Sequence, residues 1–223
     1  ENSPYRQEIA EPALRHIRLG VVAAGGDRDY GEALIAKYEF DYDRAIRLAA
    51  TSWKNKPLYY PAGILQGWSY LDRGQDRGRK GDLEGAQRDL DEAGRIVARL
   101  VDNARSDPQI RRLESSRRLS CLYMASKRGR IPEPLFSWAE AACADLQRAA
   151  SRNPQTYYLR AALLDLASEQ AMERGQDPIP QIDAAMQEIG HALELQPDNA
   201  SFWMKLAVPR ERRNMYRLGQ GEI

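Results

Sequence analysis

The stretch Ala185-Met-Gln-Glu-Ile-Gly-His-Ala-Leu-Glu-Leu-Gln-Pro197 decides the fold, because it sets small and bulky side chains at fixed helical spacings. Ala185 is followed by Ile189 four residues later, by Ala192 three later and by Pro197 after five more. Spacings of three and four place side chains on one helical face, where alanines let a neighbouring helix approach closely. We therefore expect an amphipathic helix that packs against another helix and ends before the proline.

The same order of side chains recurs, which indicates an internal repeat. Residues 142–154 repeat all three offsets, and shorter versions occur twice nearer the amino terminus. The repeated positions are Ala142, Leu146, Ala149 and Pro154, then Ala86, Leu90 and Ala93, and more faintly Ala45 and Ala49.

Turn glycines set the length of each helix pair. Gly81, Gly129, Gly175 and Gly219 lie 48, 46 and 44 residues apart, whereas ordinary repeats of this kind have about 34 residues. The helices should therefore be longer than usual, and nothing alternates with period two for long enough to predict a strand. We expect helices at about 4–20, 29–39, 42–54, 58–79, 82–105, 108–128, 133–152, 155–174, 178–195 and 200–218.

These helices predict one all-α repeat domain over residues 1–223. An N-terminal helix and turn occupy 1–28, and an unpaired terminal helix occupies 199–223. The helix pairs between them cover 29–56, 57–107, 108–153 and 154–198.

The helix after Pro197 carries a family signature. Trp203, Leu206 and Ala207 have the large, large, small order of a tetratricopeptide (TPR) first helix, and Gly67 and Tyr70 hold the same places earlier. From Asp29 onward the chain resembles the TPR family. The resemblance implies a right-handed, antiparallel helix-pair solenoid with longer than standard helices, and it places Trp203 in the core.

A more specific resemblance is to the repeat region of bacterial serine/threonine protein kinases. It rests on residues 11–15, 33–39, 42–45, 80–86, 104–108 and 173–178. It implies a carboxy-terminal sensor or scaffold array whose catalytic domain lies outside this chain. A kinase needs a glycine-rich loop on a strand, a following lysine, a catalytic aspartate after His-Arg and an Asp-Phe-Gly, and none of these occurs. We therefore expect no enzymatic activity from these residues.

The composition of the chain limits the classes of partner that it can bind. Lys+Arg 33 and Asp+Glu 32 give a net charge of +1, so no global field attracts nucleic acid or an anionic membrane. No apolar run reaches the roughly 18 residues that cross a bilayer.

Two cysteines and two histidines are too few for an ordinary zinc site, so we expect no metal or cofactor. We expect both thiols, Cys121 and Cys143, to be buried in the core. The resemblance implies a bacterial protein, and the sequence does not decide between a cytoplasmic and an extracytoplasmic location.

Two groups of residues are candidates for binding a partner. Residues 109–130 carry seven cations and one acid, and Arg111 and Arg118, seven apart, share a helical face that could grip an acidic peptide. The alternative is a solvated face that balances the acidic helix at 82–92. The second group is tyrosines, which are adjacent in sequence at Tyr59-Tyr60 and at Tyr157-Tyr158. Two adjacent side chains cannot both face a core, so we expect Tyr60 or Tyr157 to reach a groove or solvent. The alternative is that these tyrosines pack between neighbouring helix pairs.

The sequence thus predicts a non-catalytic module that binds a protein or peptide, with an acidic partner favoured by the arginines. Two further functions remain open: a groove that senses a small ligand, and self-association into a homo-oligomer through the unpaired terminal helix.

Overall fold

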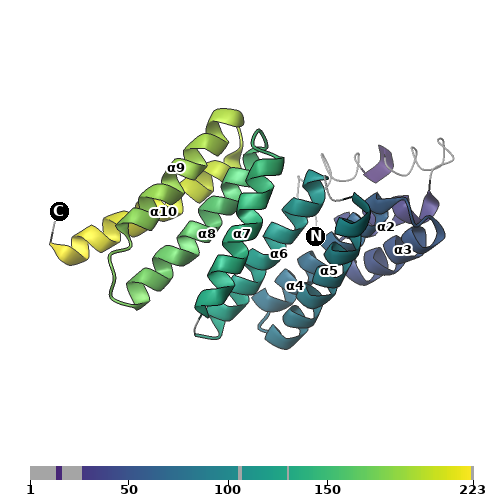
Figure 1. Ribbon diagram of the computed structural model, residues 1–223, viewed down its shortest axis with the longest axis horizontal. Helices are drawn as coiled ribbons and strands as arrows, with labels where there is room; N and C mark the ends of the chain where they lie inside the picture. Colours follow the sequence, from purple (N-terminus) through teal and green to yellow (C-terminus); the bar gives the residue numbers. More distant parts are fainter. Residues whose placement is uncertain (1–13, 17–26, 105–106, 130, 222–223) are drawn as a thin grey trace. The chain divides into compact units, whose positions relative to one another are not determined.

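The computed structural model describes residues 14–16, 27–104, 107–129 and 131–221. All regular structure in these ranges is helical (Figure 1). The chain divides into two compact units, residues 1–106 and 107–223, and each is described by itself. Most of the N-terminal helix predicted at 4–20 lies outside the described residues; residues 14–16 are helical.

The residues from Asp27 onward in the first unit form two helix pairs. They are α2 (Arg28–Tyr38) with α3 (Tyr42–Asn55), and α4 (Tyr60–Arg79) with α5 (Leu83–Ala104). Each helix packs against the next along the chain, and α2 also contacts α4. The first helices of the two pairs therefore form one layer, as a stack of helix pairs requires.

The second unit repeats this arrangement. It contains α6 (Pro108–Lys127), α7 (Glu133–Ala149), α8 (Pro154–Glu173), α9 (Ile179–Leu195) and α10 (Ala200–Gln220), which Figure 1 shows side by side in chain order. Contacts link α6 to α8 and α8 to α10, in addition to those between consecutive helices. Helices packed in neighbouring pairs, predicted from the alanine spacing, are thus confirmed within each unit.

The repeated alanines lie where the spacing predicts. Ala185, Ile189 and Ala192 are fully buried in a cluster that joins α8, α9 and α10. Ala142 and Leu146 are buried in α7, and the earlier set is also fully buried, namely Ala45, Ala49, Ala86, Leu90 and Ala93. Burying an apolar side chain contributes roughly 25 cal/mol per Å², so these faces supply the main attraction between helices.

Two predictions of core residues are wrong, because the side chains concerned are exposed. Ala149 is exposed, because α7 ends at that residue instead of continuing to 152. Trp203 is 52% exposed and Ala207 is exposed, whereas Phe202 and Leu206 face the core. Only one of two adjacent aromatic residues can face inward, and Phe202 takes that place.

Glycines in the left-handed conformation follow four of the described helices. Gly81, Gly129 and Gly175 follow α4, α6 and α8 and adopt positive φ values of 87°, 92° and 68°, which glycine adopts without steric cost. The sequence predicts this role for Gly219 at the end of α10, but α10 continues to Gln220 and Gly221 holds the left-handed position, with φ 74°.

Candidate functional site

A hollow of about 500 Å³ opens in the first unit where α3 ends. Ala50, Trp53 and Lys54 line it from the last turns of α3, and Pro57 and Leu58 line it from the following loop. Gln66 of α4 and Arg99 of α5 complete the lining. Three helices and one loop therefore contribute to a single concave surface.

Trp53 forms the apolar wall of this hollow and is held from two sides. Its indole N–H donates to the backbone carbonyl of Pro57 at 3.1 Å, which fixes the ring and the loop together. On α4, Gly63 has no side chain where a Cβ would come within 2.9 Å of the Trp53 ring. The close approach of α4 thus keeps Trp53 rigid and only 5% exposed.

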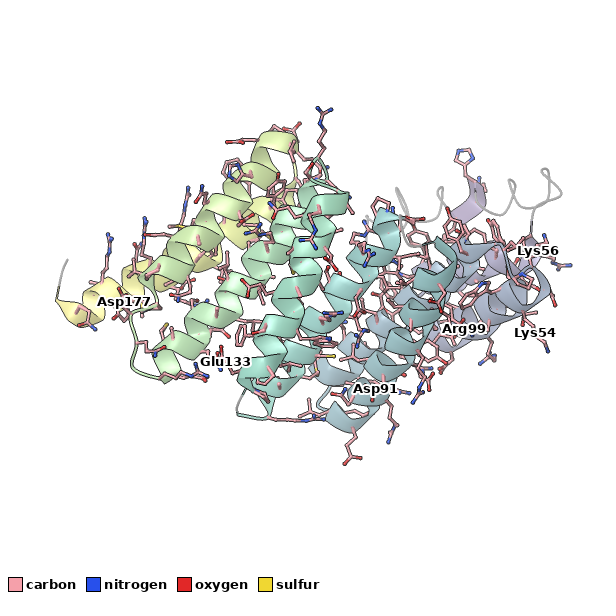
Figure 2. All side chains as sticks on the ribbon, in the orientation of Figure 1. Lys54, Lys56, Asp91, Arg99, Glu133 and Asp177 are labelled. Carbon is pink, nitrogen blue, oxygen red and sulfur yellow. The ribbon has the colours of Figure 1, made fainter. Side chains whose placement is uncertain are left out.

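The other walls are basic. The Arg99 guanidinium lies over the Trp53 ring, 4.3 Å from its centroid, which is a cation–π contact. The side chain of Lys54 is exposed at the end of α3, and Figure 2 shows Lys54, Lys56 and Arg99 on the first unit. Neither aspartate nor glutamate is part of this lining. The surface therefore carries local positive charge although the whole chain is nearly neutral.

Lys56, next to the hollow in sequence, is held by α2. Its ammonium lies 3.3 Å from the carboxylate of Asp27, which also accepts from the Ser52 hydroxyl at 2.9 Å. Burial raises the pKa of Asp27, but its hydrogen bonds with the Tyr30 backbone and Ser52 and its pairing with Lys56 outweigh burial and leave it lowered. This ionised carboxylate ties the loop before α4 to the start of α2.

Chemically, the hollow suits a carboxylate next to an apolar group. A guanidinium that stacks through its face keeps its N–H donors in its own plane, where they can bind a carboxylate. Leu58, 90% exposed at the rim, offers an apolar contact beside the cations. This lining does not pair a nucleophile with a general base.

The arginines predicted to bind a partner lie elsewhere, on α6. Arg118 donates to Glu114 at 2.6 Å and to the backbone carbonyl of Trp138, and it also stacks on the Trp138 ring. Arg111 lies 3.7 Å from Asp145 of α7. Both side chains reach the second helix of their own pair, so they hold α6 to α7, and their role in binding a partner stays a prediction.

The predicted tyrosines are also engaged in packing. Tyr157 donates its hydroxyl to the carbonyl of Ser151 at 2.9 Å, and its ring lies 5.6 Å from that of His191. Its neighbour Tyr158 packs between the two cores of the second unit. Tyr60 begins α4 and is half-buried, while Tyr59 stacks edge-on against Tyr30. Tyr60 belongs to the first unit, whereas Tyr157 and the two arginines belong to the second.

Sequence reasoning missed the residues of the hollow. Trp53 and Arg99 are 46 residues apart and meet only because α3, α4 and α5 pack together. One local signal existed: Pro57-Leu58 follows a run with Lys54 and Lys56, which is an apolar residue exposed beside cations in a loop.

Both thiols of the chain lie in the core. Both Cys121 and Cys143 are buried and unbonded to each other, as predicted. Within the described ranges, no three of the His, Cys, Asp and Glu side chains gather as a metal site would need. The described helices also include none with the length and apolarity that crossing a membrane demands.

Comparison with families, with curated proteins and with solved structures finds no match to this chain.

Proposed function

We propose that this chain is a non-catalytic, TPR-like helical-repeat module that binds acidic peptide segments of other proteins. Its helix pairs bury their small-residue faces against one another, which leaves the outer faces of the stack to vary for binding. The proposal includes a right-handed solenoid, by resemblance to the TPR family.

The basic hollow of the first unit carries this proposal. Its Trp53 wall, its two cations and its acid-free lining match a peptide with carboxylates beside an apolar residue. Its volume of about 500 Å³ falls within the range typical of small-molecule and side-chain pockets. Lys54 supplies a mobile point charge, whereas Arg99, stacked on Trp53, supplies a fixed planar one.

Fluorescence anisotropy with two labelled peptides tests the proposal. The whole chain should bind a peptide of sequence Glu-Glu-Leu-Glu-Glu and should bind its Lys-Lys-Leu-Lys-Lys counterpart far more weakly. Lys54→Glu should weaken the acidic peptide about tenfold, because it removes one attraction and adds one repulsion of under about 1 kcal/mol each. Raising salt to 1 M should also weaken it, because exposed charge pairs are screened.

Arg88→Glu is the matched control. Arg88 is exposed on α5, like Arg99, and does not line the hollow, so the net charge changes equally while the site stays intact. Equal weakening by Lys54→Glu and Arg88→Glu would mean that only net charge matters, and the hollow would then not be the binding site.

Self-association is a second candidate function, favoured by α10. Trp203, Met204, Val208, Met215 and Leu218 are all exposed and fall on one side of this helix. The corresponding place in α8, counted from its Asn153 cap, holds Tyr157, Tyr158 and Ala161, which pack against α9. The exposed side of α10 is thus a surface of the kind that another helix covers, and a second copy of α10 is the proposed occupant.

Light scattering across a concentration series tests self-association. The wild-type chain should form dimers, and Met204→Glu should return it to monomers, because a charge in an apolar contact is costly to bury. Gln220→Glu adds the same charge at an exposed position on the opposite side of α10, and it should leave the dimer in place. A monomer at every concentration would end this second proposal.

The association with a bacterial serine/threonine kinase is likewise a proposal, supported only by the sequence resemblance. It assigns the phosphate transfer to a separate catalytic domain. Incubation of this chain with ATP and Mg²⁺ should therefore give no phosphorylated product; transfer by these residues alone would refute it.

A further inference from the structure

A second hollow, in the other unit, points to a different ligand. It encloses about 250 Å³ between α7, α8 and α9. Phe136 and Leu164 provide apolar walls, and Glu133, Glu140 and Arg174 provide charges. Figure 2 shows Glu133 on the second unit, at the start of α7. None of these residues belongs to the basic hollow of the first unit.

Gln181, near the start of α9, lines this hollow with an unsatisfied acceptor. Its side-chain oxygen is buried, and no hydrogen-bond donor reaches it. A buried polar atom without a partner destabilises the folded state, and a ligand that donates a hydrogen bond to it would relieve this cost. By contrast Gln170, on the neighbouring helix, donates its amide to the Ile131 carbonyl at 2.9 Å and is satisfied.

The charges of the lining favour a cation. Arg174 lies 3.2 Å from Glu133, and this pair is neutral. Glu140 is exposed, and among the described residues no cation forms an ion pair with its carboxylate. Two residues with an acceptor that no printed partner satisfies, Glu140 and Gln181, therefore line the same hollow beside an aromatic wall, and the charged residues of the lining sum to −1.

We propose that this hollow binds an ammonium group on an aliphatic stem, such as a lysine side chain. The stem would lie along Phe136 and Leu164, while the ammonium donates to Gln181 Oε1 and to the Glu140 carboxylate. An ammonium donates in three directions, which suits two acceptors on different helices better than a planar guanidinium does. A volume of about 250 Å³ is below that of most drug-sized sites, so it fits one side chain or a small amine.

Titration of the whole ¹⁵N-labelled chain with three probes tests the site. N-acetyl-lysine methylamide should shift amide resonances of α7, α8 and α9 and should saturate. Its neutral counterpart N-acetyl-norleucine methylamide should bind at least tenfold more weakly, because it lacks the ammonium. Equal binding of the two derivatives would overturn the proposal. Butylammonium is the third probe: tighter binding of the lysine derivative assigns the cation to a polypeptide, and tighter binding of butylammonium assigns it to a free amine.

Gln181→Met separates binding from folding. Methionine has nearly the same shape without the amide, so the variant removes the unsatisfied acceptor from the folded state. We expect its Tm to rise by about 2–4 °C while the Kd for the lysine derivative weakens about tenfold. Gln187→Met is the matched control on the same helix, where Gln187 is exposed, and neither quantity should change.

Glu140→Gln keeps the test decisive if Gln181→Met fails to fold. Glu140 is exposed, so this variant should fold normally and weaken the lysine derivative about fivefold. Glu173→Gln, an exposed acid of α8 outside the lining, should have no effect on the Kd. Unchanged affinity in Glu140→Gln would refute the site, whatever happens at the basic hollow of the first unit.

Discussion

Gly63 of α4 lies directly against the indole ring of Trp53: a Cβ at position 63 would come within 2.9 Å of two ring atoms and of Leu100. Real Cβ atoms do not approach so closely, so this glycine sets the distance between α4 and the end of α3. Glycine is unfavourable in a helix interior by about 1 kcal/mol relative to alanine. Its presence in α4 is explained by this contact, which also places one wall of the basic hollow.

Gly63→Ala should therefore destabilise the chain. The added methyl group meets a rigid ring, and overpacking of this kind costs about 1–3 kcal/mol, more than the gain in helix propensity. Chemical denaturation followed by circular dichroism measures the change. Gly190→Ala is the control, since nothing lies within 4 Å of a Cβ at position 190 of α9, and it should stabilise by up to about 1 kcal/mol. A neutral or stabilising Gly63→Ala would show that the ring can move aside.

Asp165 of α8 anchors the last helix. Its buried carboxylate is bonded to Lys205 and Arg212 of α10, and Arg212 also donates to Ser168 at 2.8 Å. Removing one partner of a buried ion pair leaves the others uncompensated and typically costs about 3–5 kcal/mol. Asp165→Ala should therefore release α10.

Hydrogen exchange measured by mass spectrometry checks this. Amides of α10 should lose protection in Asp165→Ala, while those of α2 to α5 keep theirs. Asp183→Ala breaks the exposed pair with Arg213, 3.1 Å long, and should change protection little, because exposed pairs are worth under about 1 kcal/mol. Uniform loss of protection across both units would mean that Asp165 supports the whole fold.

Cys143 should be inert as a thiol in the folded protein. Burial raises the pKa of Cys143 to about 11, despite the nearby charges of Arg160 and Arg118. Only the thiolate reacts with Ellman's reagent, and at pH 8 a thiol with this pKa is almost wholly protonated. Release of thionitrobenzoate should therefore be slow in buffer and fast in 6 M guanidinium. A rapid stoichiometric reaction in buffer would contradict the buried position.

The repeat was predictable from the sequence because it depends on spacing alone. Ala185, Ile189 and Ala192 lie on one helical face whatever surrounds them, and the structure buries that face. Which of two adjacent aromatics faces inward depends on where the helix begins. Asn199 caps α10 by accepting from Ser201, and from that start Phe202 turns inward, while Trp203 donates its indole N–H back to Pro197 at 2.8 Å.

The two hollows could not be predicted, because they depend on contacts between helices that are distant in sequence. Arg99 becomes part of a site only by lying over Trp53, and Gln181 is notable only because no donor reaches its oxygen. Conversely, the arginines of α6 formed the strongest charge signal in the sequence, yet the structure places Arg117 and Arg118 against Glu114 and Trp138. Charge density along a chain does not show which charges are already paired.

Glu114 should make the stability of the second unit depend on pH. Burial raises the pKa of Glu114, but the hydrogen bonds and charges of Arg117 and Arg118 outweigh burial and leave it lowered. A carboxyl whose pKa is lower in the folded state stabilises the fold above its unfolded pKa of about 4.3, and that stabilisation is lost as pH falls through the folded value.

Glu114→Gln should therefore cost stability at pH 7 and much less near pH 3. Urea denaturation of both proteins at the two pH values measures the difference, with Glu173→Gln, an exposed acid of α8, as the control that should cost little at either pH. If Glu114→Gln were equally destabilising at both pH values, its effect would come from lost packing, and the two arginines would not hold the carboxyl in its ionised form.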